Sequence, residues 1–299
     1  MNNNKHYAAA ISAFVVWGFF SLPLRALNEY TAGEILYFRI ACSVIILLII
    51  ILGFRKTEIR QDAQRLKEFP SRERNQIIAL TLAGALLLIV NWLIFIYVIN
   101  HINIKTASFS YFICPVLTAV LGNFILKERL TTLQWSAVAL CVISCVLLGL
   151  NSVQELGYSF AVAISYALYL VSQRKNYGFD RLTVLAVQMV FALIVLTASY
   201  PWLVSAAPET FFFYGMIAIV AGVFTVLPLF LNLFALNRIN SATVGILLYI
   251  NPMMNFVIAF FIFNETVTSL QLIGYVIILI ALVLFNYPNL KKLKAKVSG

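Results

Sequence analysis

The sequence predicts an all-α polytopic membrane protein of about ten transmembrane helices. Of its 299 residues, 62% are hydrophobic and 11% are charged, which gives more apolar surface than a soluble core of this length can bury. Apolar runs such as residues 40–52 and 273–285 reach, with their flanks, the roughly 20 residues that cross about 30 Å of hydrocarbon. These runs lack the apolar–polar alternation of membrane β-barrel strands. Lipid is therefore the expected main solvent.

Ten apolar stretches define the predicted spans. The first is too long for the apolar region of a signal peptide and lacks a persuasive small-residue cleavage site after it, so it is expected to remain as a span. The stretches cover residues 7–27, 33–53, 76–99, 104–126, 131–150, 155–173, 182–200, 211–236, 241–263 and 269–286.

The distribution of basic residues predicts the orientation of the chain. With the N-terminus in the cytoplasm, only Arg25, Arg39 and Lys105 of the 21 Lys and Arg residues fall outside or within the membrane. The positive-inside rule then places both termini in the cytoplasm of a multi-pass protein of the bacterial cytoplasmic (inner) membrane. We interpret the net charge of +10 as this topology signal and not as a nucleic-acid-binding surface. The expected partners are therefore the lipid bilayer and a small-molecule substrate, and no nucleic acid. A monomer and a homodimer both remain open.

An internal repeat relates the two halves of the chain at an offset of 137 residues. The spacing between the aligned proline, glutamate and glutamine is the same in both halves, which indicates a real duplication. The aligned segments are Asn100–Asn103 with Asn237–Asn240, Ile113–Pro115 with Ile250–Pro252, Glu128 with Glu265, and Thr131–Gln134 with Thr268–Gln271.

The earlier spans align at an offset near 149 residues, which completes two units of five spans each. The units are residues 1–150 and residues 151–299, the second of which carries a basic cytoplasmic tail. An odd number of spans per unit predicts inverted-topology repeats related by a pseudo-two-fold axis in the membrane plane. The aligned pairs are Trp17 with Tyr166, Arg25 with Arg174, and Arg39 with Gln188.

Matching faces on the fourth and ninth spans predict a path through the membrane. Ser108, Tyr111 and Pro115 recur at intervals of three and four, and Pro252 and Asn255 lie on the corresponding face of the ninth span. Small and weakly polar residues also let transmembrane helices pack closely, so a packing seam is the alternative. The prolines favour a cavity, because they free backbone carbonyls that need protein or water as partners.

Further polar and aromatic residues on the first, third, sixth and eighth spans extend this hypothesis, because polar-tipped aromatic rings offer a ligand both an apolar body and a hydrogen bond. The full set of predicted cavity residues is Trp17, Arg39, Asn91, Trp92, Ser108, Tyr111, Pro115, Tyr166, Tyr169, Asn232, Tyr249, Pro252 and Asn255.

Arg39 is the one clear charge away from a span end, about 9 Å inside the boundary at 1.5 Å per residue. An arginine at this depth needs a partner or an aqueous path. Contact with a substrate or gate and a structural pairing are both compatible with the sequence.

Intramembrane carboxylates are missing from the sequence, apart from Glu34, Glu128 and Glu265 at span ends. Antiport of cationic drugs usually needs such an acid, so neutral, zwitterionic or anionic solutes fit better. The cysteines and histidines form no metal-binding pattern, and no carboxylate pair or nucleophile with a base predicts an enzyme. The sequence thus predicts no catalytic residue, metal or cofactor.

The sequence resembles the RarD-like permeases, which are EamA-type carriers of the drug/metabolite transporter superfamily. The segments that carry this resemblance are Val16–Gly18, Gly33–Arg39, Asn91–Phe95, Ala107–Pro115, Leu121–Gly122 and Lys127–Arg129. The resemblance implies two inverted five-helix repeats around a central cavity, and export or exchange of amino acids, metabolites or drugs. Cys114 departs from the asparagine expected before the first-repeat proline, whereas Asn251 precedes Pro252.

The leading functional hypothesis is a transporter that moves a small metabolite, amino acid or drug-like solute by alternating access through this cavity. A channel, or a membrane sensor or scaffold without carrier activity, is the alternative.

Overall fold

The computed structural model of the chain describes residues 4–127, 129–175, 178–236 and 247–297, and every regular element in these ranges is helical. Glu128 and the segment 237–240 of the predicted repeat lie outside the described residues. The elements are α1 (Asn4–Gly18), α2 (Ser21–Arg25), α3 (Ala32–Phe54), α4 (Lys56–Glu68), α5 (Ser71–Tyr97), η1 (Val98–Ile102), α6 (Ile104–Leu126), α7 (Thr132–Asn151), α8 (Val153–Lys175), α9 (Arg181–Ala198), α10 (Tyr200–Leu203), α11 (Phe211–Ala221), η2 (Gly222–Val226), α12 (Leu227–Leu236), α14 (Ile250–Phe261) and α15 (Ser269–Val297).

Nine helical segments within the described ranges are long and apolar enough to cross a membrane. They match nine of the ten predicted spans to within a few residues at most ends. The remaining predicted span, 241–263, begins in residues outside the described ranges, and its described part contains the shorter apolar helix α14. The predicted all-α polytopic membrane fold is confirmed.

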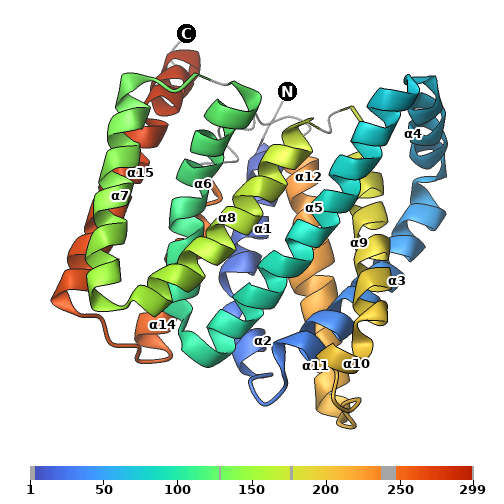
Figure 1. Cartoon of the computed structure of the whole chain (residues 1–299), viewed down its shortest axis with the longest axis horizontal. Helices are drawn as coiled ribbons and strands as arrows, with labels where there is room; N and C mark the ends of the chain where they lie inside the picture. Colours follow the sequence, from blue (N-terminus) through green and yellow to red (C-terminus); the bar gives the residue numbers. More distant parts are fainter. Residues whose placement is uncertain (1–3, 128, 176–177, 237–246, 298–299) are drawn as a thin grey trace.

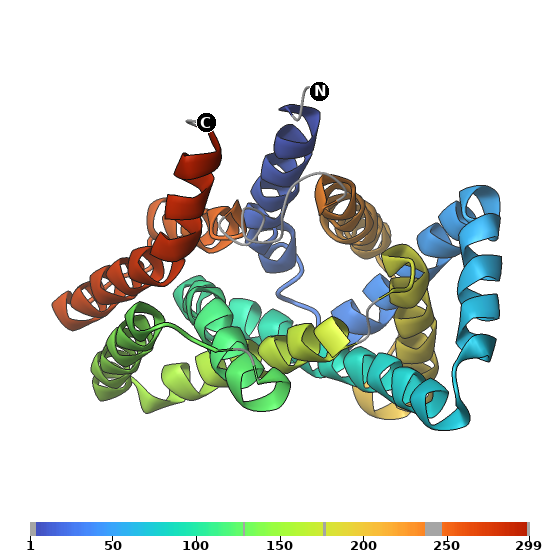
Figure 2. The ribbon, with the colours of Figure 1, turned by 90° about the horizontal axis from the view of Figure 1, so that it is seen from above.

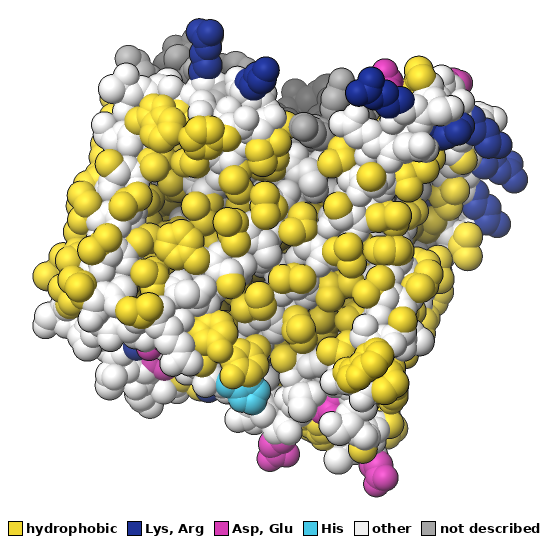
Figure 3. Space-filling view, viewed as in Figure 1, with side chains coloured by type: hydrophobic (Ala, Val, Ile, Leu, Met, Phe, Trp, Pro, Cys, Tyr) yellow, Lys and Arg dark blue, Asp and Glu magenta, His cyan; other side chains and the backbone are white. Residues whose placement is uncertain are grey.

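The surface is divided as a membrane protein requires. Hydrophobic side chains cover the middle of the molecule in the view of Figure 3, and Lys and Arg side chains gather at the end where both termini lie in Figure 1. Large apolar side chains such as Ile49 and Leu150 are 65% and 73% exposed. Such an apolar surface faces lipid rather than water.

Helices from residues 1–150 pack mainly against helices from residues 151–299. The contacting pairs include α1 with α12 and α14, α5 and α6 with α8, α3 with α9, and α7 with α15. Seen from above, α1, α12 and α14 lie on one side of the central region, and α5, α6 and α8 lie on the other (Figure 2). The interior is therefore built by both halves.

The first predicted span is broken near its middle, between α1 and α2. The break follows Gly18, where an added Cβ would lie 2.7 Å from the Cβ of Met254, so only glycine permits this close crossing of α1 and α14. Pro23 within α2 cannot donate a backbone hydrogen bond, which disfavours a continuous helix here. Phe20 lies in this break and is buried in the main hydrophobic cluster.

Candidate functional site

Arg39 occupies the centre of the candidate site, although it lies on a span that is otherwise apolar. Its side chain is 3% exposed. The guanidinium carbon lies 4.8 Å from the ring centroid of Phe20 and 4.7 Å from that of Trp92, so an aromatic ring from α5 and one from the α1–α2 break both contact the cation. These cation–π contacts offset part of the cost of burying the charge. We call Phe20, Arg39, Trp92 and Thr225 the Arg39 site.

The hydroxyl partner of Arg39 comes from the second half of the chain. Arg39 Nε donates a hydrogen bond of 3.0 Å to Thr225 Oγ1, and Thr225 Oγ1 donates one of 2.9 Å to the Val220 carbonyl. Thr225 lies in η2, a π-helical segment between α11 and α12. Such segments displace a side chain from its α-helical position and often occur at functional sites.

Arg39 has no carboxylate partner in the part of the chain that the structure describes. None of the ion pairs in the described part of the chain involves it. Glu34 on the same helix accepts a hydrogen bond from the Thr31 amide in the capping box of α3. Arg39 is thus paired with a neutral hydroxyl and two aromatic rings, which answers the sequence-based expectation of a partner without supplying a counterion.

A row of aromatic rings connects the Arg39 site with α6 and α8. Phe20 contacts Phe95 at 6.2 Å between ring centroids, Phe95 contacts Tyr111 at 5.2 Å, and Tyr111 contacts Tyr166 at 5.7 Å. Tyr169 continues the row at 5.8 Å from Tyr166. The three tyrosines are only partly buried. The structure therefore brings five predicted residues, Arg39, Trp92, Tyr111, Tyr166 and Tyr169, into one connected group.

Trp17 has a structural partner. Its indole Nε1 donates a hydrogen bond of 3.0 Å to the Phe224 carbonyl. Pro228 lies four residues after Phe224 and has no N–H, so the usual α-helical donor to this carbonyl is missing. Trp17 replaces the missing donor and fixes α1 against the segment that carries Thr225.

Gln188, the repeat mate of Arg39, contacts the mate of Phe20. It is buried on α9, where the Tyr169 hydroxyl donates to Gln188 Oε1 over 3.5 Å and Gln188 Nε2 donates to the Thr81 carbonyl over 3.3 Å. The offset that relates Arg39 to Gln188 also relates Phe20 to Tyr169. Matching positions in the two halves are therefore in contact, through a cation–π contact in the first half and through the tyrosine hydroxyl in the second.

Two predicted residues on α5 and α6 bond to nearby backbone. Asn91 Nδ2 donates to the Val162 carbonyl at 2.8 Å and to Ser165 Oγ at 3.2 Å, which links α5 to α8. Ser108 Oγ donates to the Ile104 carbonyl of its own helix at 2.9 Å. The Ser108 hydroxyl is thus satisfied within a packed region.

The predicted residues of the ninth span lie apart from the Arg39 contacts. Pro252 and Asn255 are buried on α14, and Asn255 Nδ2 donates to Asn251 Oδ1 at 2.7 Å. Tyr249 packs against the buried cluster of α6, α7, α8 and α15, as does Tyr166. Pro115 is partly buried within α6, one turn after Tyr111.

Buried polar atoms that lack a hydrogen-bond partner indicate where a ligand has something to bind. Within the described residues, these atoms include Arg39 Nη1, the Oγ atoms of Ser21 and Ser43, the Oδ1 atoms of Asn91, Asn232 and Asn255, and the Tyr249 hydroxyl. Buried groups of this kind are rare unless a ligand or water completes them.

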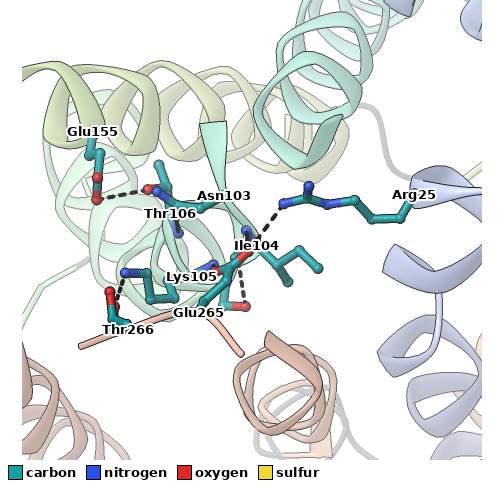
Figure 4. Close-up of polar contacts among 9 residues, drawn as sticks. Arg25, Asn103, Ile104, Lys105, Thr106, Glu155, Glu265 and Thr266 are labelled. Carbon is teal, nitrogen blue, oxygen red and sulfur yellow. Dashed lines mark hydrogen bonds and ion pairs between the residues drawn. The ribbon is translucent and has the colours of Figure 1, made fainter. Parts of the chain in front are cut away.

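The two halves are also joined at the end of the molecule remote from the termini (Figure 4). Glu265 accepts hydrogen bonds from Arg25 Nη2 at 3.1 Å and from the backbone amides of Ile104 and Lys105 at 2.7 and 3.0 Å. The Lys105 ammonium donates to the Thr266 carbonyl. A carboxylate at the first turn of α6 is also favoured by the helix dipole. We call these five residues the Glu265 cluster.

A separate pocket of about 460 Å³ lies between α3, α5, α8 and the α10 region. Its lining includes Gly33, Tyr97, Tyr158 and Leu203, and none of the predicted cavity residues. Within the described residues no group of three or more His, Cys, Asp or Glu side chains is arranged to hold a metal ion.

The EamA-like transporter family matches the chain twice, over residues 4–150 and 155–287. The chain belongs to the EamA-like transporter family. This EamA-like protein is therefore a multi-pass membrane protein of a transporter family of the drug/metabolite type, as the sequence predicted.

Relatives of this EamA-like transporter extend over almost the whole chain. An uncharacterized transporter of Vibrio cholerae serotype O1 is 33% identical over 294 residues, which span 96% of this chain and 93% of the relative. Protein RarD of Salmonella typhimurium is 28% identical over 282 residues and 92% of each chain. The predicted similarity to RarD-like permeases is confirmed. A solved structure with 13% identity and a TM-score of 0.60, covering 95% of this chain and 96% of that one, shares the fold.

Phe20 and Thr225 were missing from the predicted site of this EamA-like transporter. Phe20 had a signal in the sequence, because its repeat mate Tyr169 was among the predicted residues. Thr225 is a lone hydroxyl in an apolar span, and its position depends on the π-helical segment, which hydrophobic periodicity does not reveal.

Proposed function

We propose that this EamA-like transporter is a carrier that moves a small metabolite, amino acid or drug-like solute by alternating access through a central cavity. One observation carries the proposal. Arg39 is buried where α3 and α5 meet η2, it is held by side chains from both halves, and its Nη1 has no partner among the described residues. A site between two halves is where a rocking motion changes access.

The internal repeat supports a rocking mechanism with inverted halves. Thr131 and Gln134 form a reciprocal capping box at the start of α7, and their mates Thr268 and Gln271 make the same two hydrogen bonds at the start of α15. The contacts of α1 with α12 likewise correspond to those of α8 with α5. We therefore assign residues 1–150 and 151–299 as the two moving units.

The Glu265 cluster is the proposed closure of one end of the path. Arg25, Ile104 and Lys105 belong to the first unit, whereas Glu265 belongs to the second. Opening that end requires the three hydrogen bonds of Glu265 to be exchanged for water. At the opposite end, Asp180 of the second unit pairs with Arg55 at 3.2 Å. Alternating access then consists of making one set of contacts while releasing the other.

The orientation is part of the proposal. The end with the Lys and Arg side chains faces the cytoplasm of a bacterial inner membrane, both termini lie there, and the Glu265 cluster faces outward. Reporters fused after Lys67 and after Ser298 should read cytoplasmic, and one fused after Ala206 should read external. A cytoplasmic reading at Ala206 would refute the inverted arrangement.

Thiol labelling tests the carrier itself. In protein whose four cysteines are replaced, single cysteines introduced at Asn232 and Asn255 should react with an impermeant thiol reagent from either side of a sealed vesicle. The reason is that the central cavity of a carrier opens to each side of the membrane in turn. Thiols react as thiolates in water, so Ile49→Cys, which faces lipid, is the matched unreactive control. Labelling from one side only, or none, would contradict alternating access.

A further inference from the structure

The Arg39 guanidinium retains binding capacity at one edge. Nε is occupied by Thr225, and the guanidinium carbon lies over the rings of Phe20 and Trp92. Nη1 is buried and has no hydrogen-bond partner among the described residues. The Nη1–Nη2 edge therefore remains for a ligand, and this edge of an arginine matches the two oxygens of a carboxylate.

The fold does not require a charged side chain at the position of Arg39. Its repeat mate Gln188 is equally buried on the matching span, and its amide is satisfied by the Tyr169 hydroxyl and the Thr81 carbonyl. A neutral side chain thus suffices at that place in one half. In the other half Arg39 has no counterion among the described residues, although buried charges are normally paired. A ligand is the remaining source of the negative charge.

The surroundings limit the charge and the shape of that ligand. Among the described residues, the other buried charged side chains are Glu34 and Lys105, and both are bonded at helix ends. A single cation in an apolar region balances one negative charge and would leave a dianion in excess. Trp92 and the row from Phe95 to Tyr166 provide apolar faces beside the charge. Ser43, one turn from Arg39, adds a hydroxyl without a partner.

We propose that the solute is an organic monocarboxylate with an apolar, preferably aromatic, body, whose carboxylate pairs with the Nη1–Nη2 edge of Arg39 while its body lies against Trp92 and the tyrosines. This inference rests on the proposed carrier function and narrows its substrate. Substrate release would leave Arg39 unbalanced in the apolar interior, so the empty site favours rebinding of another anion. Exchange of one organic anion for another is the expected mode of transport.

Matched acids and amides test this inference on the purified full-length protein. Thermal unfolding is followed with 3-phenylpropanoate and 4-methylpentanoate, with their neutral amides, and with sodium chloride at the same ionic strength. A ligand that binds the folded state raises the unfolding temperature in proportion to RT ln(1+[L]/Kd). We expect the acids to raise it, and the amides and chloride to leave it unchanged. Equal shifts with acid and amide, or no shift with either acid, would overturn the inference without any variant.

Variants locate the charge that is responsible. Arg39→Gln should weaken binding of the acid at least tenfold, Arg39→Lys should retain part of it, and Arg60→Gln, on the exposed face of α4, should retain all of it. Unchanged binding in Arg39→Gln would overturn the inference. Should that variant not fold, the acid–amide comparison in the wild-type protein still decides.

The labelling assay separates this inference from the proposed function. If cysteines at Asn232 and Asn255 are labelled from both sides and protected equally by acid and amide, the carrier stands and the anion site fails. If the acid binds through Arg39 but the cysteines are labelled from one side only, the anion site stands and alternating access fails.

Discussion

Arg39 and Gln188 occupy matching positions in the two halves of the chain, yet one is a cation and the other a neutral amide. Both are buried, and each contacts the aromatic residue at the matching position of a neighbouring helix. Gln188 is satisfied by a hydroxyl and a backbone carbonyl, whereas Arg39 Nη1 has no hydrogen-bond partner within the described ranges. At this pair of positions the two halves differ in the charge of the side chain and in how its hydrogen-bonding groups are satisfied.

The largest effect is expected when the charge is placed in the half that lacks it. Gln188→Arg would bury a guanidinium against α5, where Thr81 and Tyr169 provide only neutral partners. An uncompensated buried charge costs about 3–5 kcal/mol, so little folded protein should accumulate. Size-exclusion profiles of solubilised protein measure this, with Gln188→Met as the control of similar size. Normal yield of Gln188→Arg would show that the second half also accommodates a charge.

The close approach of α5 to Gln188 gives the next effect. A Cβ on Gly84 would lie 2.6 Å from Gln188 Nε2 and 2.7 Å from Gln173 Nε2, so both amides must move. Because these atoms end flexible side chains, the cost is mainly the hydrogen bond of Gln188 to the Thr81 carbonyl, and we expect Gly84→Ala to lower the free energy of unfolding by about 1 kcal/mol. Gly53→Ala is the matched control, because nothing lies within 4 Å of its added Cβ. Thermal unfolding compares the two, and equal stability would argue against the tight crossing.

Loss of the helix cap should destabilise the two halves by similar amounts. Thr131→Ala and Thr268→Ala each remove a capping box that the repeat shares, and each should cost about 1 kcal/mol. The measurement is the unfolding temperature of both variants under one condition. Clearly unequal losses would mean that the repeat is not preserved in the energetics of the two helix starts.

The smallest change in stability is expected for Arg39→Gln, which places glutamine at both matching positions, 39 and 188. Removing a buried charge that lacks a counterion should leave the free energy of unfolding within about 1 kcal/mol of the original value, or raise it. Thermal unfolding without any ligand measures this effect. A large decrease in the free energy of unfolding would show that Arg39 has a structural role, which is the alternative that the sequence left open.

The sequence predicted the fold because hydrophobic length and the distribution of Lys and Arg are one-dimensional signals. It also indicated Arg39, Trp92 and the tyrosines, since polar tips in apolar spans are visible without a structure. It did not predict the Arg39 site as a whole. Phe20 is placed by a helix break and Thr225 by a π-helical segment, and both distortions depend on contacts between distant helices. Ser108 was predicted for the cavity on spacing alone, and spacing does not reveal that its hydroxyl bonds within its own helix.

The Glu265 cluster has a consequence for how such a protein can change over evolutionary time. Two of the three donors to the Glu265 carboxylate are the backbone amides of Ile104 and Lys105, which every residue except proline provides. The start of α6 can therefore vary in sequence without losing this contact. Side-chain substitutions change the cluster only at Arg25, Lys105 and Glu265, so in the proposed carrier the balance between open and closed states would be tuned independently of the Arg39 site.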